Sequence, residues 1–171
     1  QLDTHGIIVQ LPIPDRLDKD KIIDTVDPVK DVDGQTSVNN KLLFVGSSLR
    51  HSEFSSGSEK IPKQVRDDNF LGYIPATTKG ILTLLDYYKI PIAGKHVVII
   101  GRSSLVGKPT ALALLNRNAT VTICHSKTSH LSLITSHCDI LIVAAGKPKL
   151  ITKDHVSKNQ VVVDVGINVI D

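Results

Sequence analysis

Residues 96–126 read HVVIIGRSSLVGKPTALALLNRNATVTICHS, and this stretch decides the fold that the sequence predicts. The apolar, β-branched run at 97–100 predicts a buried strand, and the turn GRSSLVGKP follows at 101–109. The segment 110–117 predicts a helix, and 119–123 predicts a second short strand. Strand, glycine-rich turn, helix and strand in this order are typical of a dinucleotide-binding unit.

Two glycines in this turn have distinct physical reasons to be there. Gly101 ends the first strand, where the backbone must bend sharply, and Gly107 lies where a helix begins against the sheet. Ser103 and Ser104 offer hydroxyl groups, and the helix N-terminus offers free N–H groups to an anion. Ser103 occupies the place of the middle glycine in G-x-G-x-x-G, and the last glycine comes one residue late. On this motif alone, a purely structural turn and a nucleotide-binding turn both remain open.

The tip of the second strand bears on the choice of cofactor. In dinucleotide-binding folds an acid at this tip favours a free ribose 2′-hydroxyl, and residues 125–128 contain no acid. Arg102 and Lys127 supply positive charge, and Ser126 and Thr128 supply hydroxyls, which together suit a 2′-phosphate. We therefore expect NADP rather than NAD as the cofactor, with a solvated surface loop as the alternative.

Composition narrows the class of protein. The 171 residues can form one sizeable core, or one domain and part of another, and a net charge of +3 is too small to indicate nucleic acid or membrane as a partner. Cys124 and Cys138 lie in or beside apolar runs, so we expect buried free thiols in a reducing compartment, the cytoplasm, with the mitochondrion as the alternative. No apolar run reaches membrane-spanning length. The seven histidines show no metal-ligand spacing, so we expect no metal site.

The rest of the chain repeats the alternation of strands and helices. Further strands are predicted at 6–9, 139–144 and 161–165, and helices at 18–26, from 75–80 onward with Thr77 or Thr78 as its cap, and at 131–136. The segment 41–45 fits either a helix or a strand. We predict an α/β fold, a Rossmann-like parallel sheet with helices on both faces, plus part of a second α/β domain.

The segment 46–68 differs from its surroundings. It is rich in Ser, Lys, Arg, Asp and Glu and has no apolar period, so we expect a surface loop without chemistry.

Several motifs in series resemble the methylenetetrahydrofolate dehydrogenase/cyclohydrolase family. They are GIIVQLPIP at 6–14, KDVDG at 30–34, YIPATTKG at 73–80, GRSSLVGKP at 101–109, NATVTICHSKT at 118–128 and DVGIN at 164–168. The resemblance covers nearly the whole chain. The sequence departs from the family pattern in the insertion at 46–68 and at Ala76 and Thr78, where many relatives have Cys and Pro.

The resemblance implies NADP-dependent oxidation of 5,10-methylenetetrahydrofolate to 5,10-methenyltetrahydrofolate, with hydrolysis to 10-formyltetrahydrofolate in the intact protein. It implies tetrahydrofolate derivatives as substrates, a homodimer, and two domains. Residues 1–74 would form part of the folate-binding catalytic domain, and 75–171 would form the NADP-binding domain.

The resemblance also assigns roles to particular residues. Gln10 and Asp33 would be catalytic, whereas the residues alone favour a turn hydrogen bond for Gln10 and a plain turn for KDVDG. The folate-contacting residues would be Val9, Gln10, Leu11 and Asp33. The cofactor-binding residues would be Gly101, Arg102, Ser103, Ser126, Lys127, Thr128 and Ile167.

One part of the implied site lies outside these residues. In the family a lysine drives the hydrolysis, and the resemblance implies that it precedes Gln1 and that a folate-contacting loop follows Asp171. A non-catalytic nucleotide-binding or dimerisation module therefore remains the alternative.

Overall fold

The computed structural model describes residues 3–45 and 72–167. The chain divides into two compact units, Gln1–Ala76 and Thr77–Asp171. The surface loop expected at 46–68 lies outside the described residues.

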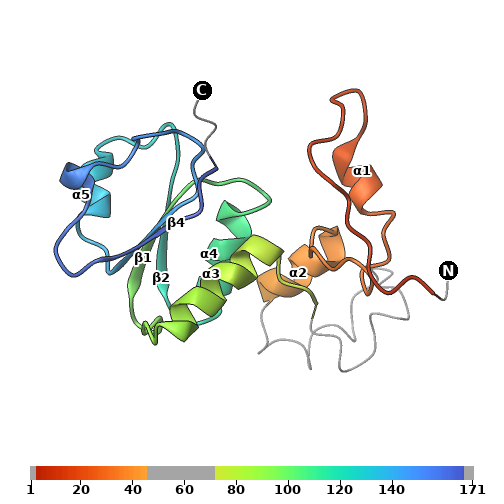
Figure 1. Cartoon of the computed structure of the whole chain (residues 1–171), viewed down its shortest axis with the longest axis horizontal. Coiled ribbons are helices and arrows are strands. Elements are labelled where there is room, and N and C mark those ends of the chain that lie inside the picture. Colours follow the sequence, from red (N-terminus) through yellow and green to blue (C-terminus); the bar gives the residue numbers. More distant parts are fainter. Residues whose placement is uncertain (1–2, 46–71, 168–171) are drawn as a thin grey trace. The chain divides into compact units, whose positions relative to one another are not determined.

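The second unit is built on a four-stranded parallel sheet (Figure 1), which confirms the expected Rossmann-like α/β fold. Its strands are β1 (His96–Ile100), β2 (Thr120–Cys124), β3 (Ile140–Val143) and β4 (Val161–Asp164), in the order β2-β1-β3-β4. The chain moves from β1 out to β2 and then crosses back to β3 on the other side of β1. The strand order therefore reverses between β1 and β3, the place where such sheets bind ligands at their carboxyl ends.

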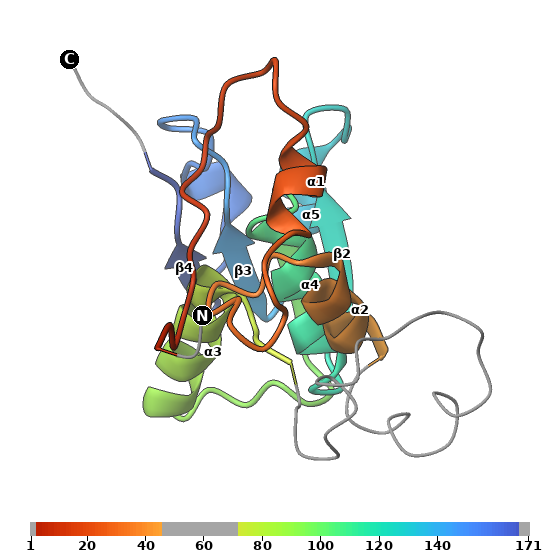
Figure 2. The ribbon, with the colours of Figure 1, turned by 90° about the vertical axis from the view of Figure 1, so that its right-hand side faces the viewer.

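Helices cover both faces of this sheet. The helices are α3 (Ala76–Tyr87), α4 (Gly107–Leu115), α5 (Leu131–Thr135) and the 3₁₀ turn η2 (Lys153–His155). Figures 1 and 2 show α3 and α4 on one face and α5 on the other. Val97, Val98 and Ile99 of β1 are completely buried, as expected for a central strand covered on both sides.

The helix predicted at 110–117 begins three residues earlier than expected, at Gly107. The side chain of Ser103 accepts hydrogen bonds from the backbone N–H groups of Val106 and Gly107, which stabilises an early start. Pro109 then falls in the first turn, where its missing N–H costs no helical bond.

The predicted threonine cap of α3 is not what the structure shows. The helix already begins at Ala76, and Thr78 lies within it, fully buried. Its hydroxyl is 3.0 Å from the hydroxyl of Thr110 in α4, so the side chain joins two helices.

An acidic side chain ties the amino ends of two strands together. Asp139 accepts hydrogen bonds from the His96 backbone N–H at 2.9 Å and from the Lys95 ammonium at 3.1 Å. These two contacts, the His96 bond first, lower the pKa of Asp139 below its ordinary value. They lie at the opposite edge of the sheet from the glycine turn.

The first unit contains α1 (Lys19–Ile23) and α2 (Ser37–Val45) in its described part. The prediction of a strand at 6–9 is wrong, because in the described structure this segment makes only one isolated parallel bridge, between Ile7 and Asp31. The helix expected at 18–26 is shorter, because bonds of the i→i−3 type close it after Ile23. The segment 41–45 is helical.

No helix in the described ranges is long and apolar enough to cross a membrane.

The close approach at Gly107 yields a prediction with a built-in control. A Cβ at Gly107 would lie 2.2 Å from the carbonyl oxygen of Gly101, whereas a Cβ at Gly80 in α3 would meet nothing within 4 Å. We expect Gly107→Ala to lower the free energy of unfolding by about 3 kcal/mol or more. Gly80→Ala should raise it by about 0.5–1 kcal/mol. Urea denaturation measures both, and equal effects of the two changes would contradict the packing described here.

The buried hydroxyl pair yields a second prediction. Thr78→Val or Thr110→Val leaves one hydroxyl buried without its partner, so each should cost about 1–3 kcal/mol of unfolding free energy. The double variant replaces both groups by apolar ones of the same shape and should cost less than the sum of the single changes. A double-mutant cycle by chemical denaturation checks this, and strict additivity would show that the two hydroxyls do not interact.

Candidate functional site

The glycine turn after β1 is held by backbone contacts with its neighbours. Gly101 has a φ of 124°, a conformation that L side chains rarely adopt, and a Cβ there would lie 2.6 Å from the carbonyl oxygen of Ala144. Its N–H donates to the carbonyl oxygen of Cys124 at 2.9 Å. The turn thus lies between the ends of β2 and β3, at the reversal of strand order.

The backbone of this turn presents a row of open donors. Among residues 3–45 and 72–167, no acceptor is found for the N–H groups of Arg102, Ser103, Ser104 or Leu105. Successive free N–H groups before a helix N-terminus attract a phosphate or another anion. The Ser103 hydroxyl oxygen accepts from the start of α4, which leaves its own proton free to donate.

The tip of β2 is a second, self-contained turn. The Thr128 N–H donates to the His125 carbonyl oxygen at 2.8 Å, and the His125 N–H donates to the Thr128 hydroxyl at 2.9 Å. The N–H of Lys127 donates to Nδ1 of His125 at 3.2 Å. Thr128 therefore also holds the turn, a role that the sequence did not indicate.

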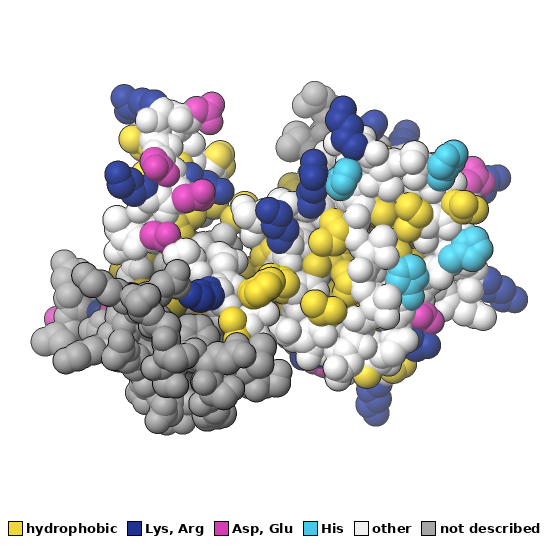
Figure 3. All heavy atoms as spheres, turned by 180° about the vertical axis from the view of Figure 1, so that it is seen from behind, with side chains coloured by type: hydrophobic (Ala, Val, Ile, Leu, Met, Phe, Trp, Pro, Cys, Tyr) yellow, Lys and Arg dark blue, Asp and Glu magenta, His cyan; other side chains and the backbone are white. Residues whose placement is uncertain are grey.

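The side chains of Arg102, Ser126 and Lys127, near these turns, are exposed and have no partner among the described residues. The register pairs Ile100 with Cys124, so Arg102 and Ser126 each lie two residues beyond a matched pair of parallel strands. The two expected groups of cofactor residues therefore leave neighbouring strands at the same edge. Figure 3 shows Lys, Arg and His side chains along the upper rim of this unit.

Ile167 lies beyond the end of β4, the strand furthest from β2. Its side chain is 88% exposed, unusual for a large apolar residue. The backbone around it packs closely, because a Cβ at Gly146 would lie 3.3 Å from the Ile167 carbonyl oxygen and one at Gly166 would lie 2.6 Å from that of Ala145. An exposed apolar side chain thus lies beyond the carboxyl ends of β3 and β4, at the same edge of the sheet as the glycine turn.

In the first unit, the single bridge between Ile7 and Asp31 brings two expected groups of residues together. Val9 and Asp33 each lie two residues beyond this parallel pair. Gln10 is exposed, and within residues 3–45 and 72–167 its amide donates only to the carbonyl oxygen of the adjacent Leu11, at 3.0 Å. The local turn bond that the residues alone favoured is present, and the rest of the Gln10 amide is open.

The two acids of KDVDG are in different environments. Asp31 is 4% exposed, and its Oδ2 accepts from the Thr36 N–H at 2.7 Å and from the Asn39 amide at 2.8 Å. Asp33 is half-buried, and within the described part of the chain its carboxylate has no partner. Asp31 therefore builds the turn, and Asp33 is the acid available to a ligand.

Asn39 was missed by the sequence analysis. It is fully buried, donates to Asp31 and to the Pro28 carbonyl oxygen, and accepts from the Tyr73 N–H at 3.0 Å. One side chain thus joins three separate segments of this unit. The available signal was an Asn eight residues after an Asp, which is too common to single out.

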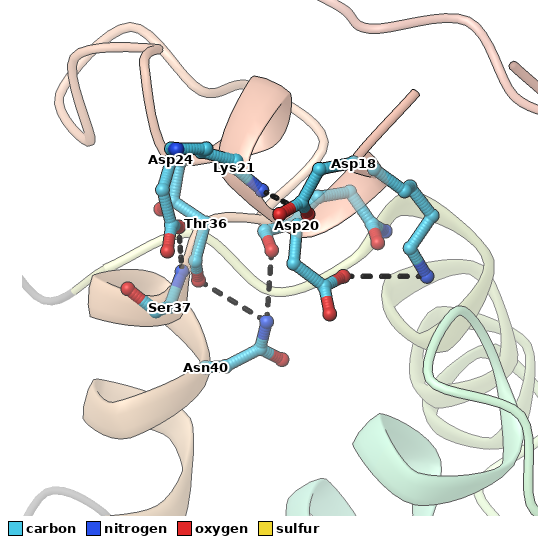
Figure 4. Close-up of polar contacts among 9 residues, drawn as sticks. Asp18, Asp20, Lys21, Asp24, Thr36, Ser37 and Asn40 are labelled. Carbon is cyan, nitrogen blue, oxygen red and sulfur yellow. Dashed lines mark hydrogen bonds and ion pairs between the residues drawn. The ribbon is translucent and has the colours of Figure 1, made fainter. Parts of the chain in front are cut away.

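A second set of contacts joins α1 to α2 (Figure 4). Asp18 accepts from the Lys21 N–H and caps α1, and Asp24 accepts from the Ser37 N–H at 2.7 Å. The Asn40 amide donates to the carbonyl oxygens of Gln35 and Thr36. These bonds fix the segment that follows Asp33.

Metal or thiol chemistry finds no support in the described residues. No group of three His, Cys, Asp or Glu residues there could hold a metal ion. Both cysteines are free and buried, and burial raises the pKa of the Cys124 and Cys138 thiols. A thiol with a raised pKa is a poor nucleophile.

Comparison with known proteins identifies the family of this chain. Residues 75–171 match the model of the tetrahydrofolate dehydrogenase/cyclohydrolase NAD(P)-binding domain. The "Bifunctional protein FolD" of Acholeplasma laidlawii is 52% identical over 167 residues, which cover 98% of this chain and 52% of that protein. The chain spans about half the length of the curated relatives it matches.

Solved structures show the same likeness. The bifunctional FolD enzyme of Campylobacter jejuni is 42% identical, with a TM-score of 0.80, and the match covers 96% of this chain and 50% of that one. The FolD of Trypanosoma brucei, solved with NADP cofactor and an inhibitor, is 32% identical, with a TM-score of 0.77, over 96% of this chain and 49% of that one. The resemblance noted in the sequence is thereby confirmed: the chain belongs to the tetrahydrofolate dehydrogenase/cyclohydrolase family and contains its NAD(P)-binding domain.

Proposed function

We propose that this chain is the NADP-binding part and a portion of the folate site of a methylenetetrahydrofolate dehydrogenase that also acts as a methenyltetrahydrofolate cyclohydrolase. The observation that carries the proposal is the edge formed by the GRSSLVGKP turn and the tip of β2. There, the open backbone N–H groups of the turn after β1 lie beside the acid-free tip of the neighbouring strand β2, where Ser126 and Lys127 have no partner among the described residues. Bifunctional enzymes at up to 52% identity support it further.

The residues present fit the cofactor. Gly101 and Gly107 bring the end of β1 and the start of α4 so close together that a side chain at either position would overlap backbone. The open N–H groups of 102–105 and Ser103 would hold the pyrophosphate. Arg102, Ser126 and Lys127, with the hydroxyl proton of Thr128, would hold the 2′-phosphate. Ile167 would offer an apolar surface to the nicotinamide ring.

The chemistry divides between cofactor and protein. When bound, the nicotinamide supplies the hydride acceptor for the one-carbon bridge of methylenetetrahydrofolate. The protein holds the two rings in reacting geometry, which is where most of its contribution to the rate would come from. We assign folate contacts to Val9, Gln10 and Leu11 and to Asp33. Gln10 and Asp33 would orient the folate for both reactions.

For the hydrolysis, water adds to the methenyl cation. We assign the driving lysine to the part of the relatives that these 171 residues do not span. The open amide of Gln10 and the unpaired carboxylate of Asp33 support their assignment as polar groups available to the folate. The alternative, a non-catalytic nucleotide-binding or dimerisation module, is not favoured, since the matched relatives are bifunctional enzymes.

We also propose that the intact protein is a homodimer, as the family resemblance implies. We propose the cytoplasm as its compartment, with the mitochondrion as the alternative. Two buried free thiols agree with a reducing compartment.

Cofactor preference is the most direct test. NADP should bind more tightly than NAD, and Arg102→Ala or Lys127→Ala should weaken NADP binding about 10- to 100-fold because each removes a charged phosphate contact. NAD binding should change little. Calorimetric titration of both cofactors measures this, with Lys158→Ala as a control, since Lys158 is exposed just before the amino end of β4. Equal affinities, or tighter binding of NAD, would overturn the assignment.

In this proposal the folate site is divided, with Gln10 and Asp33 in this chain and the driving lysine outside it, and this division leads to a further prediction. The 171-residue polypeptide alone should bind NADP but convert neither methylene- nor methenyltetrahydrofolate at the rate of a full-length relative. Displacement of a substrate by about 1 Å already costs roughly a hundredfold in rate, and we place the driving lysine outside these residues. The absorbance change on methylene-to-methenyl conversion and on methenyl hydrolysis checks both steps. Rates equal to those of the full-length relative in either assay would show that the residue roles above are wrong.

A further inference from the structure

One histidine takes part in all three hydrogen bonds of the turn at the tip of β2. The carbonyl oxygen and the N–H of His125 bond to Thr128, and the ring nitrogen Nδ1 is the one contribution of its side chain. The ring nitrogen accepts the N–H of the residue two positions later, Lys127, at 3.2 Å. Asp and Asn side chains commonly accept this i→i+2 bond, and here an imidazole does so.

This bond determines how the ring can be used. A nitrogen that accepts a backbone N–H carries no proton, so the neutral imidazole of His125 has its proton on Nε2. Ser126 lies inside the small ring that the bond closes, and Lys127 supplies the donor. The bond therefore fixes the backbone from which both side chains project.

Hydrogen bonds of His125 and Thr128 order the backbone of the turn, but no contact among residues 3–45 and 72–167 orders the side chains of Ser126 and Lys127 directly. Ser126 and Lys127 are exposed, and neither side chain has a partner in residues 3–45 or 72–167. Groups that must be free to meet an anion cannot be held by ion pairs of their own, so the backbone beneath them must supply the order. Without that order, binding would include the entropic cost of fixing the turn.

We propose that His125 is a positioning residue for recognition of the 2′-phosphate. Its Nδ1 holds the turn so that Ser126 and Lys127 face the phosphate before it arrives. The inference rests on the proposed function, because it assumes NADP as the ligand. It differs from a direct contact, in which the Nε2 proton of His125 would itself donate to the phosphate.

Two substitutions separate these roles. In His125→Asn the amide oxygen takes the place of Nδ1 and can accept the Lys127 N–H, but the donor at Nε2 is lost. In His125→Gln the amide nitrogen takes the place of Nε2, but the acceptor at Nδ1 is lost. His125→Ala removes both. His130→Asn is the matched control, since His130 is an exposed histidine with a φ of 53°, which Asn tolerates.

The dissociation constants of NADP and NAD are measured by calorimetry for the 171-residue chain and its four variants. We expect His125→Ala and His125→Gln to weaken NADP binding about three- to tenfold, with NAD unchanged. His125→Asn and His130→Asn should stay within about twofold of the unchanged protein. Retained affinity in His125→Gln with a loss in His125→Asn would overturn positioning in favour of direct contact. Unchanged NADP affinity in all variants, or equal losses for NADP and NAD, would also overturn it.

A measurement on the unsubstituted chain keeps the proposal testable if a variant fails to fold. Amide hydrogen exchange in the cofactor-free protein should be slower for Lys127 than for Ser126, whose N–H has no partner in the described structure. Equal, rapid exchange at both would overturn the proposal. If the unsubstituted chain shows no preference for NADP over NAD, the proposed function fails. If it prefers NADP and the variants behave alike, only the role of His125 fails.

Discussion

The second unit depends on one contact, the approach of the start of α4 to the end of β1. Gly107 lies so close to the Gly101 carbonyl oxygen that any side chain would overlap it, and Gly101 in turn lies against the Ala144 carbonyl oxygen. Glycine at both positions lets three pieces of backbone meet where the strand order reverses. A ligand at this edge would lie beside the turn at 102–105, whose N–H groups have no acceptor among the described residues.

The contact also explains the distribution of the polar groups. Ser103 is used twice, since its side chain and its carbonyl oxygen both accept N–H groups at the start of α4. That arrangement satisfies the helix end and leaves the preceding N–H groups free. In the first unit, Asp31 and Asn39 satisfy the turn beneath Asp33 in the same manner. In the second unit Ser103 makes the structural hydrogen bonds, and in the first unit Asp31 makes them. The neighbouring donors at 102–105 and the carboxylate of Asp33 therefore have no partner among the described residues.

Much of this could be predicted from the sequence, and the failures have identifiable causes. The apolar runs located β1 to β4 within one or two residues, because parallel strands buried on both faces give continuous apolar signals. Gly107 was predicted correctly because a glycine at a strand-to-helix turn has few alternative explanations. Thr78, Asp31 and Asn39 could not be assigned, since their partners are 5 to 34 residues away and leave no periodic trace. The strand at 6–9 failed because apolar character alone does not supply a neighbouring strand to pair with.

Recognition of a phosphate sets two requirements that oppose each other. The recognising groups must be unpaired in the free protein, yet a flexible unpaired group loses affinity through the entropy of being ordered. The turn at 125–128 meets both, because hydrogen bonds made by His125 and Thr128 order the backbone and leave the side chains of Ser126 and Lys127 open. If this turn recognises the 2′-phosphate, as we propose, its selectivity for a phosphate over a hydroxyl depends on the absence of an acid at this tip as much as on the cations present. A carboxylate there would pair with Arg102 or Lys127 and remove the charge that the phosphate requires.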